Sequence, residues 1–141
     1  MSVVHSGWRG SLKNIAGKTV QKMVEAFGVD PETIEAGVGP SIGPCCAVFE
    51  DESVLTKEAL RYRVKGPKGA STQRFDFWAM TRDQLLAEGV RDEAMEFCGI
   101  CTMCHKDRWF SFRGDKPDVG RFGSVVGLNL VSQALPLNLN T

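Results

Sequence analysis

The sequence lacks an excess of charge of either sign. Its 141 residues include 17 lysines and arginines and 17 aspartates and glutamates, so the formal net charge at pH 7 is zero. Proteins that bind nucleic acid or an anionic membrane surface usually carry a basic surplus. We therefore predict neither nucleic acid nor a membrane as a main partner of this protein.

Long hydrophobic runs and an export signal are also missing. No stretch approaches the roughly 18 apolar residues that cross a bilayer, and the N-terminus has no basic segment followed by an apolar run. The five cysteines are an odd number at irregular spacing, which suits a reducing compartment better than a disulfide framework. We predict a cytoplasmic protein with one domain over residues 1–141.

The motifs of several well-known catalytic sites are absent. The sequence has no G-x-x-x-x-G-K-[ST] or H-E-x-x-H pattern. A zinc site of the cytidine-deaminase type needs H-x-E, and the segment after His5 has no glutamate at that position. His5 and His105 are the two histidines, which disfavours a copper oxidase that needs several histidine ligands.

Hydrophobic spacing predicts alternating strands and helices. The predicted strands span residues 2–5, 34–38, 93–97, 109–112 and 122–130, and the predicted helices span 11–27, 52–62 and 75–90. This order indicates an α+β fold in which mixed β-sheets are flanked by helices. A buried strand at the start of a chain is unusual because termini lie at the surface. We therefore expect the fold to lack its N-terminal portion, or another chain to supply it.

Two of the three loops that carry candidate functional side chains lie in the first third of the chain. His5 and Arg9 belong to H-S-G-W-R-G, where a histidine at a strand end is rigidly placed and a guanidinium fork suits phosphate. The Gly/Pro loop at 39–46 offers Ser41 and backbone amides for an oxyanion, and Cys45 as a ligand or nucleophile. The structural alternatives are a hydrogen-bonded core histidine and a proline-stiffened turn.

The third loop follows an aromatic segment at residues 109–112. It contains Arg113, Asp115 and Arg121. An aromatic ring can stack on a planar base while arginine donates charge-assisted hydrogen bonds to phosphate or sugar. A solvated charged loop is the alternative interpretation of these residues.

The segment at residues 98–105, CGICTMCH, holds three cysteines and one histidine. Its spacing fits haem attachment through Cys101 and Cys104, or half of a zinc or iron–sulfur site. Haem attachment is expected on the exported side of a membrane, and no export signal is present. A zinc ribbon needs a second cysteine pair, and we expect the adjacent Cys45 and Cys46 to have the wrong geometry for it.

Four segments resemble the laccase-domain family, also called multicopper polyphenol oxidoreductase or peptidoglycan-editing factor. They are VVHSGWRGSLKNIAGKTVQKM, GVGPSIGPCCAVF, RFDFWAMTRDQLLAEGV and CGICTMCHKDRWFSFRGD, and they occur in the family's order. The resemblance runs from Val3 to about Leu128. It implies a laccase-domain sandwich, similar to cysteine-hydrolase folds, and an enzyme that acts on purine nucleosides.

The resemblance implies a zinc-dependent purine nucleoside phosphorylase that also deaminates adenosine and phosphorolyses methylthioadenosine. His5 matches a zinc ligand of the family, and two further ligands lie upstream in Q-V-H-G and T-A-D-C motifs that this chain does not contain. We expect a homodimer or a second chain to supply them. The alternatives are a truncated non-catalytic homologue or partner chain, a copper polyphenol oxidase and a cell-wall precursor hydrolase.

The resemblance also implies roles for individual side chains. Arg9 and Arg113 are predicted catalytic residues that hold phosphate and offset charge as the glycosidic bond breaks. The predicted substrate and phosphate contacts are Ser41, Cys45, Asp115 and Arg121. The family usually has a second arginine where this chain has Gly114. The C-T-x-C turn at 101–104 implies small buried sulfurs that shape the pocket wall, with His105 on the surface.

Overall fold

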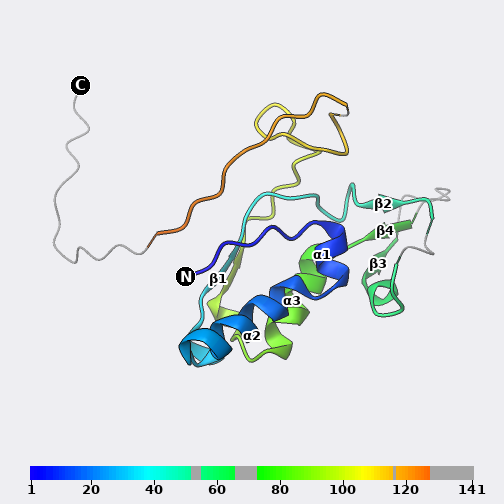
Figure 1. Cartoon of the computed structure of the whole chain (residues 1–141). Helices are drawn as coiled ribbons and strands as arrows, with labels where there is room; N and C mark the ends of the chain where they lie inside the picture. The colour runs from blue at the N-terminus through cyan, green and yellow to red at the C-terminus, as the bar shows by residue number, and fades with distance from the viewer. Residues whose placement is uncertain (52–54, 66–72, 116, 128–141) are drawn as a thin grey trace, which may run out of the picture.

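Two separate sheets and three α-helices form the described part of the chain (Figure 1). The computed structural model describes residues 1–51, 55–65, 73–115 and 117–127. The helices are α1 (Trp8–Leu12), α2 (Ile15–Phe27) and α3 (Phe77–Ala87), with 3-10 turns η1 (Pro31–Thr33), η3 (Ala59–Tyr62) and η4 (Asp92–Ala94). The strands are β1 (Ala36–Val38), β2 (Val48–Phe49), β3 (Arg63–Val64), β4 (Gln73–Phe75) and β5 (Met95–Phe97). This mixture of parallel and antiparallel sheets with helices confirms the predicted α+β class.

The first helical segment is divided where hydrophobic spacing predicts one helix over residues 11–27. Asn14 separates α1 from α2 and has a φ of 56°, in the left-handed region. Its side-chain oxygen caps α2 by accepting a hydrogen bond from the Gly17 N–H at 3.2 Å. The predicted cap at the other end is confirmed, since Gly28 has a φ of 62° and donates its N–H to the Val24 carbonyl oxygen at 2.8 Å.

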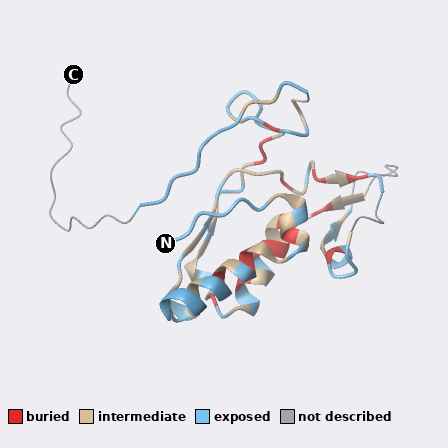
Figure 2. Ribbon diagram, viewed as in Figure 1, coloured by how far each residue is buried: buried red, intermediate tan, exposed pale blue. Residues whose placement is uncertain are grey.

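Helix α3 begins at Phe77, two residues later than predicted, because Asp76 caps it. The Asp76 carboxylate accepts a hydrogen bond from the Ala79 N–H at 2.9 Å. The preceding residue, Phe75, ends β4. The buried face of α3 packs against α2, and Figure 2 shows buried residues along both helices. The smaller of two hydrophobic cores lies between these helices. It consists of Ala16, Val20, Leu85 and Val90, with Ile34, Ala36 and Met95 packed against it.

The parallel pair of β1 and β5 confirms the strands predicted at 34–38 and 93–97, each in a shorter form. Ala36 lies opposite Met95. The pairing continues beyond the strands as a single bridge between Ser41 and Cys101. Because parallel strands end at the same edge of a sheet, the chain segments that follow β1 and β5 lie side by side.

The antiparallel sheet has the strand order β2-β4-β3. It was not predicted, because its strands have only two or three residues and are too short for a periodic signal. Phe49 of β2 packs edge-on to Phe75 and Phe77, with ring centroids 5.6 Å and 5.8 Å apart. These rings belong to the larger hydrophobic core, which also contains Ala47, Ala59 and Met80.

Three predicted strands are wrong over their described residues. Residues 2–5 form no strand, and Val3 and Val4 are 58% and 42% exposed. Residues 109–112 form no strand and pass from a bend through irregular chain to the start of a turn. Residues 122–127 have no regular structure, and 128–130 lie outside the described residues. An apolar run becomes a strand only when a neighbour pairs with its backbone, and no such neighbour is present within the described ranges.

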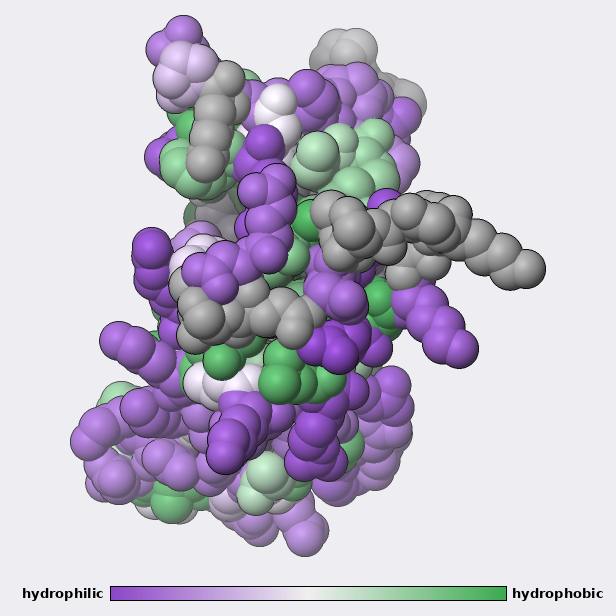
Figure 3. Space-filling view, turned by 90° about the vertical axis from the view of Figure 1, so that its right-hand side faces the viewer, coloured by the Kyte–Doolittle hydropathy of each residue, from purple (hydrophilic) through white to green (hydrophobic). Residues whose placement is uncertain are grey.

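The predicted helix at 52–62 is confirmed only at its end. Its first three residues lie outside the described residues, and the 3-10 turn η3 covers the last four. None of the helices that the structure describes combines the length and apolar character needed to cross a membrane. On the face shown in Figure 3, apolar side chains gather in separate small groups among hydrophilic ones.

Candidate functional site

Two predicted catalytic arginines flank one pair of aromatic rings. Trp8, the first residue of α1, lies edge-on to Phe49 of β2, with ring centroids 5.4 Å apart. The guanidinium carbon of Arg9 lies 4.6 Å from the Trp8 centroid, and that of Arg113 lies 5.0 Å from the Phe49 centroid. We call these four residues the arginine–aromatic stack.

The arginine–aromatic stack holds its two cations in different ways. Arg113 donates a hydrogen bond from Nη1 to the Val48 carbonyl oxygen, and its guanidinium also lies over the ring of Phe49, the next residue of β2. Two contacts with β2 therefore fix the Arg113 side chain. Arg9 is exposed and lies over the Trp8 ring. A guanidinium has five N–H donors, so contact with one carbonyl leaves donors that can reach a phosphate or carboxylate.

His5 lies before α1 and is exposed. The prediction that it ends a buried strand is wrong, since residues 2–5 have no strand partner in the part of the chain described here. A Cβ on Gly7 would lie 3.0 Å from the His5 Nε2 atom, so glycine permits this close approach. Among the described residues, His5 belongs to no group of three potential metal ligands. Its assignment as a zinc ligand stays a prediction, and the chain does not complete that site with its own described side chains.

Ser41 is hydrogen-bonded to α3. Its Oγ atom accepts a hydrogen bond from the Trp78 indole Nε1–H at 2.6 Å. Its backbone is also paired, since the Ser41 N–H donates to the Ile100 carbonyl oxygen at 3.2 Å. Ser41 therefore links the loop after β1 to both α3 and the segment after β5. An oxyanion contact from Ser41 stays a prediction.

Asp115 and Arg121 make contacts within their own loop. The Asp115 carboxylate accepts a hydrogen bond from the Ser111 N–H at 2.8 Å and pairs with Lys106 Nζ at 3.1 Å. The Ser111 hydrogen bond, followed by the hydrogen bond from Lys106, lowers the pKa of Asp115. Arg121 donates from Nη1 to two carbonyl oxygens of its own loop, each at 2.9 Å. Both side chains thus stabilise the local turn, and their substrate contacts stay predictions.

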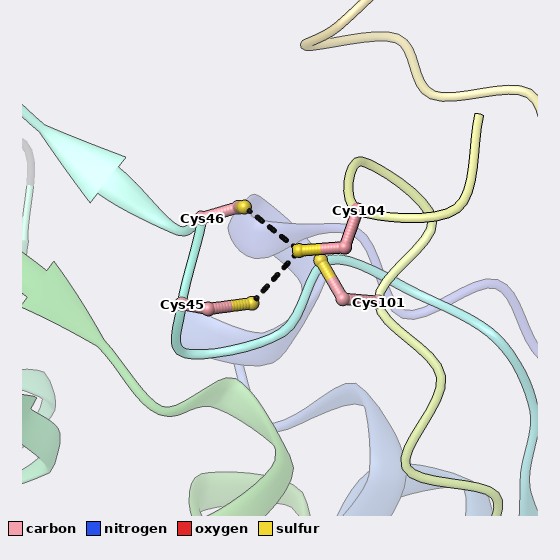
Figure 4. A group of neighbouring side chains, drawn as sticks. All are labelled: Cys45, Cys46, Cys101 and Cys104. Atoms are coloured by element: carbon pink, nitrogen blue, oxygen red, sulfur yellow. Dashed lines mark hydrogen bonds between the residues drawn. The ribbon is translucent and has the colours of Figure 1, made fainter.

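The sulfur atoms of four of the five cysteines lie close together (Figure 4). This contradicts the expectation that Cys45 and Cys46 have the wrong geometry to act as the second cysteine pair of a zinc site. The members of this four-cysteine cluster are Cys45, Cys46, Cys101 and Cys104, and their sulfur atoms all lie within 4.8 Å of one another. Cys101 is buried, whereas Cys98 is exposed and lies outside the cluster. The prediction of buried sulfurs in the turn at 101–104 is therefore confirmed for Cys101 and wrong for Cys104, and the predicted exposure of His105 is confirmed.

The sulfurs of the four-cysteine cluster differ in acidity. Desolvation and the Cys104 thiol raise the pKa of Cys45 and raise that of Cys46 to about 11. Burial also acts to raise the pKa of Cys101, but backbone hydrogen bonds from Gly43 and Cys104 outweigh it and lower this pKa to about 7. Cys101 is therefore the first of these three thiols to ionise.

Comparison with known proteins identifies a family and several relatives. Residues 1–129 match the family described as multi-copper polyphenol oxidoreductase laccase. The chain is 32% identical over 134 residues to a protein named purine nucleoside phosphorylase YlmD from Geobacillus stearothermophilus, and the match covers 90% of this chain and 48% of the relative. It is also 32% identical over 130 residues to purine nucleoside phosphorylase LACC1 from Mus musculus, covering 89% of this chain and 29% of that one.

Solved structures show the same fold. The crystal structure of YlmD from Geobacillus stearothermophilus matches with a TM-score of 0.64 and 31% identity, over 79% of this chain and 43% of that one. A hypothetical protein YfiH from Bacillus licheniformis matches with the same TM-score, 0.64, at 24% identity. The chain thus spans less than half the length of each of these relatives and solved structures.

Proposed function

This chain belongs to the multi-copper polyphenol oxidoreductase laccase family, and we propose that it provides the phosphate-binding part of a purine nucleoside phosphorylase. Support comes from the printed names of its relatives and from the arginine–aromatic stack. In phosphorolysis, a phosphate oxygen attacks the ribose C1′ atom, the bond from C1′ to the purine nitrogen breaks, and the base takes up a proton. The products are ribose 1-phosphate and a free purine.

The observation that carries the proposal is the placement of Arg9 and Arg113 on one aromatic pair. Phosphate brings two negative charges to the reaction, and planar guanidinium donors bind its oxygens in a bidentate manner. Their positive charge also offsets the charge that develops as the glycosidic bond breaks. Because Arg113 is held by the Val48 carbonyl and the Phe49 ring, it can meet phosphate with little loss of side-chain freedom.

The finer activities belong to the same proposal. We propose that adenosine, guanosine, inosine and methylthioadenosine are phosphorolysed, and that adenosine is also deaminated by water to inosine and ammonia. A zinc ion held by His5 and ligands from outside this chain would activate that water. The proposed roles of Arg9 and Arg113 in phosphate binding do not depend on this metal.

Steady-state kinetics with varied phosphate test the proposal. Purine release from inosine and adenosine is followed by chromatography, with and without inorganic phosphate, for the unaltered protein and for Arg113→Lys and Arg9→Ala. Loss of a charge-assisted hydrogen bond costs about 1.5–3 kcal/mol, so we expect kcat/KM for phosphate to fall about 10-fold to 150-fold. Arg91→Ala is the matched control, because Arg91 contacts Glu32 and Glu93 near the start of β5.

Several results would contradict the proposal. Purine release that does not require phosphate would exclude phosphorolysis. Equal phosphate dependence in Arg9→Ala, Arg113→Lys and Arg91→Ala would remove the arginines from phosphate binding. Oxidation of a phenol by oxygen in the absence of phosphorolysis would favour the activity in the family's description. A complete lack of turnover would favour the non-catalytic homologue.

A further inference from the structure

Two turns bring the four-cysteine cluster together, and Cys45 in the first of them is also a predicted substrate contact. Strands β1 and β5 run parallel, so the chain leaves both at the same edge of the sheet. The segment after β1 carries Cys45 and Cys46, and the segment after β5 carries Cys101 and Cys104. The bridge between Ser41 and Cys101 keeps the two segments side by side. Each segment therefore supplies two sulfur atoms to one point (Figure 4).

The spacing of the sulfurs matches a tetrahedral metal site. The Cys104 sulfur lies 3.4 Å from that of Cys45 and 3.5 Å from that of Cys46, and all four lie within 4.8 Å of one another. A zinc ion binds thiolate sulfur at about 2.3 Å in a tetrahedron, which places the sulfurs about 3.8 Å apart. The observed separations bracket this value, so little rearrangement is needed to admit an ion.

Backbone hydrogen bonds fix both turns. The Cys46 N–H donates to the Gly43 carbonyl oxygen at 3.0 Å, and the Cys104 N–H donates to the Cys101 carbonyl oxygen at 3.1 Å. A Cβ on Gly43 would lie 3.1 Å from the Cys101 Cβ and 2.8 Å from the Trp78 ring. Glycine at this position therefore lets the first turn approach Cys101 closely. The ligand positions are set by the fold itself.

We propose that the four-cysteine cluster binds one zinc ion through four thiolates, as a structural site separate from any metal at His5. Four sulfur ligands fill the coordination shell and leave no position for water or substrate, which is typical of structural zinc. Soft thiolate ligands disfavour magnesium, calcium and manganese. The inference stands apart from the proposed function, since metal content is measured without a substrate.

The zinc ion links the site to the arginine–aromatic stack. Cys104 begins the segment that leads to Arg113, and Arg113 contacts Val48 and Phe49 on β2. Cys46 lies two residues before Val48, whose carbonyl oxygen accepts the hydrogen bond from Arg113. An ion bound by both Cys46 and Cys104 therefore ties the segment that leads to Arg113 to the segment that leads into β2. This tie restricts how far Arg113 can move from β2.

Metal analysis of cysteine variants tests the inference. We expect the Cys104→Ser protein to hold about one zinc per chain less than the Cys98→Ser protein, as measured by plasma mass spectrometry after purification without chelator. Cys98→Ser is the matched control, because Cys98 is an exposed cysteine outside the cluster. His5→Ala should keep this zinc. Refilling with cobalt should give a sulfur-to-cobalt charge-transfer band in Cys98→Ser that is lost or weakened in Cys104→Ser.

Circular dichroism establishes whether each variant is folded. Cys101 is buried, so Cys101→Ser can fail to fold, whereas Cys104 is exposed and its variant should retain the helical spectrum. Equal zinc content in folded Cys104→Ser and Cys98→Ser would overturn the proposal. An equivalent of iron or copper in place of zinc would overturn the choice of metal. A disulfide between Cys45 and Cys104 in freshly purified protein would also overturn it, because these sulfurs would then be unable to bind the ion.

Discussion

The hydrogen bond between Ser41 and Trp78 allows a quantitative prediction. The indole Nε1–H donates to the Ser41 Oγ atom at 2.6 Å, and both side chains are partly buried. Replacement of Ser41 by alanine leaves this donor without its acceptor, which costs about 1–3 kcal/mol when the group is buried. Because burial is partial, we expect Ser41→Ala to lower the free energy of unfolding by about 1–2 kcal/mol. This corresponds to a fall in Tm of about 3–8 °C for a chain of this size.

A double-mutant cycle isolates the hydrogen bond from the packing of the tryptophan ring. Urea unfolding is measured for the unaltered protein, Ser41→Ala, Trp78→Phe and the double variant, and the coupling energy is expected to be about 1 kcal/mol. Ser41→Thr is the control, since it keeps a hydroxyl group. A coupling energy below about 0.3 kcal/mol would refute the reasoning, and so would equal losses in Ser41→Ala and Ser41→Thr.

Three further predictions concern the core, a helix cap and pH. Phe75 is fully buried, so Phe75→Ala should cost about 3–5 kcal/mol in urea unfolding, and a loss below 1 kcal/mol would contradict its place in the core. Gly28→Ala should cost about 1 kcal/mol because its φ is 62°, whereas the open-space control Gly37→Ala should not destabilise β1. The Ser111 hydrogen bond lowers the Asp115 pKa, so Asp115 stabilises the fold above the ordinary aspartate pKa of about 4. The stability difference between unaltered protein and Asp115→Asn should therefore shrink as the pH falls below about 4, toward the lowered pKa of Asp115. A constant difference in pH-dependent melting would exclude the effect.

Local sequence patterns predict the two longer helices, because a helix depends on residues that are close together in the chain. Apolar residues at helical spacing indicate α2 and α3, and Gly28 marks a helix end by its tolerance of positive φ. The break at Asn14 and the cap at Asp76 also have local signals, namely an asparagine three residues before Gly17 and an aspartate before an apolar run. These two boundaries could have been predicted from the capping preferences alone.

The short strands and the false strands show the limit of such signals. Strand β2 has two residues and forms only because β4 lies beside it. The apolar residues Val3 and Val4 lack such a neighbour in the described structure and stay exposed. Strand formation depends on pairing with a distant segment, and a single sequence does not state which segments meet.

The family and the residue types that carry chemistry follow from the sequence alone. The motifs predict functional roles for Arg9 and Arg113, but only the folded chain places them on the packed rings of Trp8 and Phe49.

The cysteines show the same division. Their spacing did not indicate that two pairs far apart in the chain share one point, because that contact depends on β1 and β5 pairing in parallel. Parallel pairing places the ends of both strands at one edge of the sheet, and only this arrangement turns four separate thiols into one group that can hold a metal ion.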